Sequence, residues 1–303
     1  MIYIATSNGI IVYDEILDTT NVVIPNKHTL GFFKKKAMGW FGLCIYGSDG
    51  FVLAGSREKL GSKSIGRSST DVKLHLINPH TLQHEVIGKV KSVYDLHQMA
   101  AWKSLVFLTD TGLNRVHVYD VNLGATISIV NIGDKRADVN HINALNIDGE
   151  NLFIGLNNKD GDSQLLKIDL NRVINYGVSD NNALIDGELI SLPGTSHSHD
   201  IEVYRSDLLV CASHDGCLIR VSNGEILFDA MGWARGIAIS PEGIWVGESP
   251  LAERSKRHNK SLSGAIHLYS HDRYELIKSI KIEASGQICD LLHINVHPEL
   301  VPA

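Results

Sequence analysis

The stretch that decides the fold is split between the two ends of the chain. Residues 2–14, IYIATSNGIIVYD, form two apolar runs separated by a polar turn, and residues 287–293, QICDLLH, form one more apolar run near the other end. Short alternating apolar runs with Gly, Asn, Asp and Ser between them are typical of β-strands and turns. We expect the last run to pair with the first two and to complete a sheet built from both ends.

Five internal segments share the form of that split unit. Each has one distinctive residue, an apolar strand, a polar turn and a second apolar strand. They are residues 41–55 (FGLCIYGSDGFVLAG), 97–109 (HQMAAWKSLVFLT), 141–155 (HINALNIDGENLFIG), 199–213 (HDIEVYRSDLLVCAS) and 235–248 (RGIAISPEGIWVGE). A third strand follows each of them, at residues 72–77, 115–120, 164–169, 217–221 and 265–269.

The repeat predicts an all-β, six-bladed β-propeller that occupies residues 1–303 as a single domain. The first residues of the six units are 56, 44, 58, 36 and 52 residues apart, which suits four-stranded blades with loop insertions. A last blade assembled from both termini closes the ring and removes exposed sheet edges. A β-sandwich or two smaller β domains are the alternatives, and the split sixth unit favours the propeller.

In units such as RGIAISPEGIWVG, residues 235–247, the chain resembles the six-bladed superfamily of NHL-repeat proteins, gluconolactonase-like hydrolases and strictosidine-synthase-like proteins. The gluconolactonase-like metal set of Glu, Asn and Asp does not map onto this sequence. Streptogramin B lyases and peptide-amidating lyases, which are propellers that use channel histidines, are similar in ligand type. No motif assigns the chain to any of these families, so the resemblance implies the fold more than the chemistry.

Composition narrows the class of protein. The formal net charge is −6 and aromatic residues make up 7% of the chain, which argues against nucleic acid or an anionic membrane as a partner. No apolar run is long enough to span a bilayer, and the N-terminal residues do not resemble a signal peptide. None of the four cysteines forms a CxxC pair, so we expect reduced thiols in a cytoplasmic protein.

Topology turns the repeat into a spatial prediction for a site. The first residue of every inner strand lies at one mouth of the central channel, and the end of every second strand returns to that mouth. The six first residues are Phe41, His97, His141, His199, Arg235 and Gln287. Residues expected on the same face are Arg57, Asn143, Asn157, His214 and Glu248, with Trp40 and Trp233 as walls of the pocket.

Three histidines at one repeat position in successive blades predict a metal site formed by His97, His141 and His199. Neutral imidazoles bind divalent ions such as Zn, Fe or Mn, whose open positions accept water or substrate. In this hypothesis Arg235 binds a carboxylate or an oxyanion, His214 or Glu248 transfers protons, and Asp95 or Asp200 orients a ligating histidine. The chain contains 15 histidines, and a single one at a strand start usually bonds only to a neighbour.

Two basic, polar insertions, residues 56–70 and 249–263, fall on the same expected face. Their cations, Arg254 among them, predict attraction of an anionic substrate, although solvated loops would have the same composition. The leading hypothesis is a metal-dependent lyase or hydrolase that acts on a small polar, anionic molecule. The alternatives are a non-enzymatic propeller that binds a protein or glycan on this face, and a metal-free enzyme that binds an anion.

Overall fold

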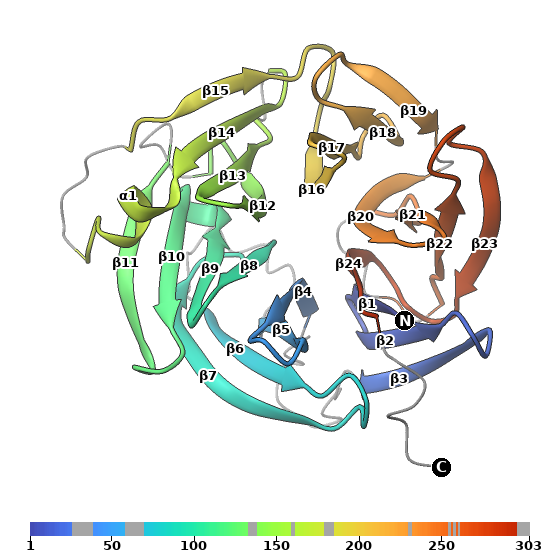
Figure 1. Cartoon of the computed structure of the whole chain (residues 1–303), viewed down its shortest axis with the longest axis horizontal. Helices are drawn as coiled ribbons and strands as arrows, with labels where there is room; N and C mark the ends of the chain where they lie inside the picture. Colours follow the sequence, from blue (N-terminus) through green and yellow to red (C-terminus); the bar gives the residue numbers. More distant parts are fainter. Residues whose placement is uncertain are drawn as a thin grey trace.

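The computed structural model contains six four-stranded antiparallel sheets arranged as blades around a central axis (Figure 1). It describes residues 1–25, 39–57, 70–132, 138–158, 161–178, 185–229, 232–253, 256, 259 and 261–295. The predicted all-β, six-bladed propeller is therefore confirmed. No helix within these ranges is long and apolar enough to cross a membrane.

Each blade runs from an inner strand at the axis to an outer strand at the rim. Blade one consists of β4 (Gly39–Tyr46), β5 (Phe51–Arg57), β6 (Thr70–Ile77) and β7 (His84–Val93). Blade two consists of β8 (Met99–Trp102), β9 (Leu105–Asp110), β10 (Arg115–Asp120) and β11 (Ala125–Asn131). Blade three consists of β12 (Ile142–Asp148), β13 (Asn151–Leu156), β14 (Gln164–Asp169) and β15 (Glu188–Ser191). Blades four and five consist of β16 (Ser198–Tyr204), β17 (Asp207–Ala212), β18 (Cys217–Arg220) and β19 (Glu225–Asp229); and β20 (Trp233–Ser240), β21 (Gly243–Ser249), β22 (Gly264–Tyr269) and β23 (Leu276–Ile282).

Blade six joins the two ends of the chain, as its sequence predicts. Its strand order is β24 (Ile288–His293), β1 (Ile2–Thr6), β2 (Gly9–Asp14) and β3 (Thr19–Pro25). In the β1–β24 ladder Ile2 lies opposite His293 and Ile4 lies opposite Leu291. Figure 1 shows the N-terminal strand beside β24, so the ring is closed by main-chain hydrogen bonds rather than by a covalent link.

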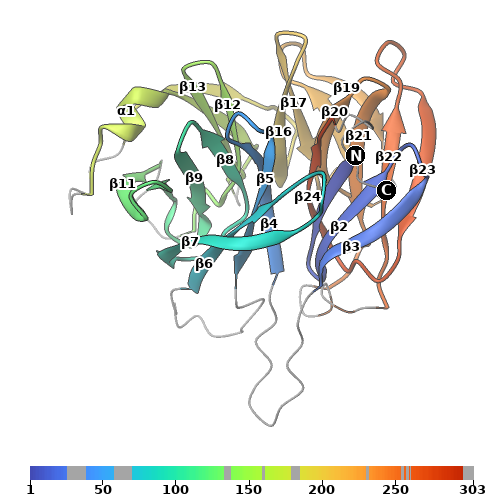
Figure 2. The same ribbon diagram turned by 60° about the horizontal axis from the view of Figure 1, so that its bottom comes forward.

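The core lies between the blades. Both faces of an inner sheet contact neighbouring blades, so inner and second strands are buried almost throughout, whereas outer strands such as β23 and β3 are mostly exposed. One cluster joins blades six, one and two through side chains that include Tyr3, Trp40, Leu53 and Val106. The four cysteines are buried thiols that form no disulfide with one another. Figure 2 shows the outer strand β7 passing along the rim of its blade.

The described residues contain two short helical segments. A 3₁₀ turn, Thr111–Leu113, follows β9, and α1 (Leu170–Ile174) follows β14. Leu170 and Val173 of α1 are buried in a core cluster with side chains of blades two and three. The carboxylate of Asp169 accepts a hydrogen bond from the Arg172 amide and caps α1.

Bulges near the start of five inner strands bring blades close together at the axis. They lie between Trp40 and Leu43, Ile142 and Ala144, His199 and Ile201, Ala234 and Ile237, and Ile288 and Asp290. Gly42, within the first bulge, has φ +78°, and a Cβ there would lie 2.6 Å from the backbone nitrogen of Met99 in blade two. The glycine is therefore required for backbone conformation and for the approach of the next blade.

Gly42→Ala is expected to lower the free energy of unfolding by about 3 kcal/mol, because it adds an interblade clash to left-handed strain. Gly47→Ala is the matched control: Gly47 has φ +74° with nothing within 4 Å of a Cβ, so it should lose only about 1 kcal/mol. Urea unfolding of both variants measures the difference. Equal losses would mean that the contact with Met99 contributes nothing.

Candidate functional site

The structure brings the three predicted histidines together at one mouth of the channel. The ring centroids of His97 and His141 are 5.2 Å apart, and those of His97 and His199 are 6.1 Å apart. Each ring comes from the start of a different inner strand, and His199 is within β16. The equivalent position in blade one is Phe41, whose ring centroid is 5.9 Å from that of His97.

Two imidazoles of this His97–His141–His199 trio are oriented by an acceptor. Nδ1 of His141 lies 2.6 Å from a carboxylate oxygen of Asp138, and Nδ1 of His199 lies 2.7 Å from the carbonyl oxygen of His197. Nε2 of His97 lies 3.6 Å from a carboxylate oxygen of Asp95. A ring that donates from Nδ1 presents its lone pair at Nε2, which is the arrangement of metal-binding histidines in proteins.

Burial keeps His199 neutral. The pKa of His199 is held well below its ordinary value by burial first, and then by the positive charges of Arg235 and His97. Burial, followed by the charge of His214, also lowers the pKa of the neighbouring His197. A neutral imidazole is the form that binds a metal, so His199 is available as a ligand throughout the physiological pH range.

The distances within the trio are wider than those of an assembled metal centre. Taking one nitrogen from each ring, no combination brings all three within 4.8 Å of one another. Metal–nitrogen bonds are about 2 Å long, so a shared ion requires the side chains to rotate inwards.

Arg235 forms the cationic side of the mouth. Its side chain is buried, and its Nη1 donates to the amide oxygen of Gln287 at 2.5 Å when that amide has its oxygen towards the guanidinium. The guanidinium carbon lies 5.4 Å from the ring centroid of Trp233. Trp233 in turn lies near His197, with ring centroids 6.4 Å apart. Arg235 is therefore held rigidly beside the trio, as a side chain that binds an anion needs to be.

A second cation is held on the other side of the trio. Arg57 is buried, its guanidinium lies 3.7 Å from the centroid of Phe41, and it donates to the carbonyl oxygen of Leu96 at 3.1 Å. It also forms an ion pair with Asp95. Asp95 thus lies close to both Arg57 and His97, and its expected role in orienting a histidine stays a prediction.

Two predicted residues lie away from the mouth pocket. Trp40 is 1% exposed and packs edge-on against His75 inside blade one, with ring centroids 4.6 Å apart, so it is part of the core rather than a pocket wall. Oε2 of Glu248 bonds to Nε2 of His267 on the third strand at 3.0 Å, so Glu248 is directed towards the outside of its blade rather than towards the trio.

The remaining predicted residues differ in exposure. The side chain of His214 is 62% exposed at the edge of the mouth, and its ring centroid is 5.4 Å from that of His197. Asn143 and Asn157 are buried, and both side-chain polar atoms of Asn143 and Oδ1 of Asn157 make no hydrogen bond. Unsatisfied buried amides are costly, so these two side chains favour a ligand or water close by. Arg254 and most of the two basic insertions lie outside the described residues.

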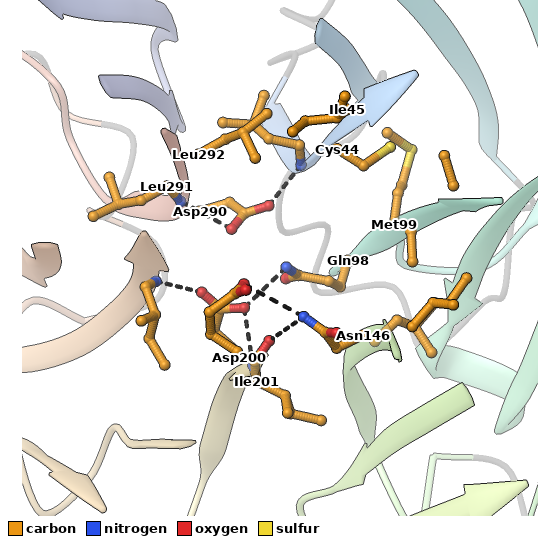
Figure 3. Close-up of a pocket in the computed structure, with 17 residues that line it drawn as sticks. Cys44, Ile45, Gln98, Met99, Asn146, Asp200, Ile201, Asp290, Leu291 and Leu292 are labelled. Carbon is orange, nitrogen blue, oxygen red and sulfur yellow. Dashed lines mark hydrogen bonds between the residues drawn. The ribbon is translucent and has the colours of Figure 1, made fainter. Parts of the chain in front are cut away.

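Sequence reasoning missed the interior of the channel, shown in Figure 3. A cavity of about 250 Å³ is lined by three carboxyl groups, those of Asp200, Glu202 and Asp290, together with Gln98 and Asn146. The carboxylate of Asp200 accepts from the amides of Ile201 and Ile237 and from Gln98, rather than from a histidine as expected. Asp290 accepts from the amide of Leu43 at 2.6 Å. The bonds of Asp200 to Ile237 and of Asp290 to Leu43 link adjacent blades, whereas the bond from Gln98 to Asp200 joins blades two and four.

Burial raises the pKa values of all three interior carboxyl groups. Burial raises the pKa of Asp200 to about 7 and, with the nearby charge of Asp200, that of Glu202 to about 8. Burial and the same neighbour raise the pKa of Asp290 well above its ordinary value. The channel thus has a cationic mouth above an acidic interior. Asp200 and Glu202, two residues apart on one inner strand and directly after His199, were the signal that could have revealed the acidic interior.

Comparison with known proteins identifies the fold. No family model matches the chain, and no curated protein is similar to it in sequence. A chain of the nidogen/laminin complex has a TM-score of 0.62 at 9% identity, with 96% of this chain and 97% of that chain covered. A Bacteroides caccae protein of unknown function has a TM-score of 0.61 at 10% identity, with the same coverage.

A third solved structure is the periplasmic gluconolactonase PpgL of Pseudomonas aeruginosa. It has a TM-score of 0.58 at 13% identity, and the alignment covers 96% of this chain and 97% of that chain. Identities this low show a common architecture and not a common activity. The chain therefore has the six-bladed β-propeller arrangement, with a gluconolactonase among its structural neighbours.

Proposed function

We propose that this protein is a metal-dependent enzyme, of hydrolase or lyase type, that acts on a small anionic molecule at the cationic mouth of the channel. The observation that carries the proposal is the trio itself. Three imidazoles from consecutive blades lie 5.2 and 6.1 Å apart by ring centroid. Two of the rings, those of His141 and His199, are oriented by an acceptor at Nδ1.

The side chains around the trio have different roles in this proposal. A divalent ion supplies a Lewis acid and an acidified water when bound. Arg235, fixed by Gln287 and Trp233, binds the carboxylate of the substrate or a developing oxyanion. His197 and His214 lie at the rim and are the nearby bases for proton transfer. The pKa of His197 is lowered by burial and then by His214, which favours its neutral, proton-accepting form.

The test begins with the metal content of tag-free protein. We expect close to one equivalent of a transition metal, measured by mass spectrometry, that is lost when His97, His141 and His199 are replaced by alanine, and a fall in melting temperature on chelation. A panel of small lactones, esters and hydroxy acids, assayed before and after chelation and after readdition of Zn²⁺, Mn²⁺ or Fe²⁺, then identifies the reaction class. Metal-dependent turnover of an anionic member supports the proposal.

Other outcomes separate the alternatives. Metal content below a tenth of an equivalent, with no gain on titration and unchanged melting on chelation, contradicts the metal site. Turnover or anion binding without metal favours the metal-free enzyme. Capture of a protein or glycan that survives replacement of all three histidines favours a non-enzymatic propeller.

A further inference from the structure

A second set of potential ligands lies at the end of the channel opposite the histidine mouth. Inner strands begin at the mouth and end at the opposite face, where β24 ends with His293 and the β20–β21 turn contains Glu242. Glu15, in the turn after β2, joins them. One ligand atom from each of these three side chains lies within 4.8 Å of the others, and this is the only such set among the described residues.

Glu15 and His293 are held in place by contacts from blades five and six. The side chains of His293 and Glu15 are 8% and 16% exposed. Nε2 of His293 lies 3.3 Å from Oε2 of Glu15, and the buried indole of Trp245 donates to Oε1 of Glu15 at 3.1 Å. The amino group of Met1 also donates to Oε2 of Glu15, at 3.0 Å. Glu242 is exposed, and its carboxyl group is the third member of the set.

The set offers the side-chain oxygens of two glutamates and the nitrogen of one imidazole.

We propose that Glu15, Glu242 and His293 form a binding site for a divalent transition metal ion, separate from the histidine mouth. One imidazole nitrogen with two carboxylate oxygens is a donor set suited to Zn²⁺ or Mn²⁺, and the imidazole disfavours Mg²⁺ and Ca²⁺. The Trp245 indole orients a ligating carboxylate, as outer contacts do at metal sites. A bound ion takes over the contact that the Met1 amino group makes with Glu15.

The position of this site gives the ion a structural role. Glu15 and His293 belong to the two halves of blade six, and Glu242 belongs to blade five. An ion held by all three joins both parts of the closing blade to its neighbour. Because the unfolded chain does not preassemble these ligands, binding stabilises the folded ring.

The test compares Glu242→Gln with Glu150→Gln. Glu150 is exposed in the turn between β12 and β13, which is the equivalent turn of blade three. Zn²⁺ and Mn²⁺ are titrated into chelator-treated protein by calorimetry, and melting is followed at about 100 times the dissociation constant. We expect a melting rise of about 5 °C in the wild type and in Glu150→Gln. Glu242→Gln should bind at least tenfold more weakly and lose most of the rise.

A triple variant with alanine at His97, His141 and His199 distinguishes the mouth from the Glu15–Glu242–His293 site. This variant should still bind one equivalent of metal and show the melting rise. His293→Gln is the second variant of the Glu15–Glu242–His293 site. The proposal is overturned if the triple variant binds no metal at all. It is also overturned if Glu242→Gln and His293→Gln, both folded by circular dichroism, bind metal as the wild type does.

Discussion

His199→Gln is expected to weaken metal binding at the mouth at least 100-fold and to abolish any metal-dependent turnover. His199 is the most completely buried member of the trio, its pKa is lowered by burial and then by the charge of Arg235, and its Nδ1 is fixed by the His197 carbonyl. Loss of one of three protein ligands lowers the affinity for the metal and disrupts its coordination geometry. Competition against a chromophoric chelator measures the dissociation constant, and circular dichroism confirms that the glutamine variant is folded.

His214→Gln is the matched control, because His214 lies at the same mouth but is 62% exposed and is not a member of the trio. It should keep the affinity for metal within about threefold, even if turnover falls. Asp138→Asn tests the orienting bond to His141 and should weaken binding by about 10- to 100-fold. A His199→Gln protein that retains wild-type affinity would remove the trio as the metal site.

The propeller could be predicted because its largest constraint is visible in the sequence. Neither the segment 2–14 nor the segment 287–293 contains enough strands for a blade. Only their pairing gives a sixth blade with four strands. Hydrophobic periodicity gave the inner and second strands, whose side chains are buried between blades. The common repeat position of His97, His141 and His199 then placed them near one another without any knowledge of side-chain contacts.

Side-chain direction was less predictable, because a shift of one residue turns a side chain to the other face of a sheet. Bulges displace the pairing between β20 and β21 and between β4 and β5. Glu248 and Trp40 lie beside these irregular stretches, and both were expected at the mouth. Their contacts with His267 and His75 within the blades depend on three-dimensional packing that no spacing reveals.

The channel interior depends on the same geometry. The bulge at Asp200, with φ +59°, directs its carboxylate to the amide of Ile237 in the next blade. Asp290 makes the corresponding contact with the amide of Leu43. An acidic residue at a strand start looks like a surface residue in a sequence, whereas here it satisfies a backbone donor at the axis.

Glu202→Gln is expected to remove a pH-dependent loss of stability. Burial first, and then the charge of Asp200, raise the folded-state pKa of Glu202 from 4.5 to about 8, against opposing bonds from the Val203 amide and Asn146. The folded state therefore keeps a proton that the unfolded state releases near its ordinary pKa. The contribution to stability is complete below pH 4.5 and is lost as the pH rises through 8.

Glutamine has nearly the same shape and does not titrate, so the variant isolates this proton. Measured in urea on chelator-treated protein, the stability of Glu202→Gln relative to wild type should rise by about 3 kcal/mol between acidic and mildly alkaline conditions. Glu150→Gln, which removes an exposed carboxyl from a turn, should show a difference that does not change with pH. A difference for Glu202→Gln that is equally flat would mean that Glu202 is ionised in the folded channel, with its charge balanced by solvent or a bound cation.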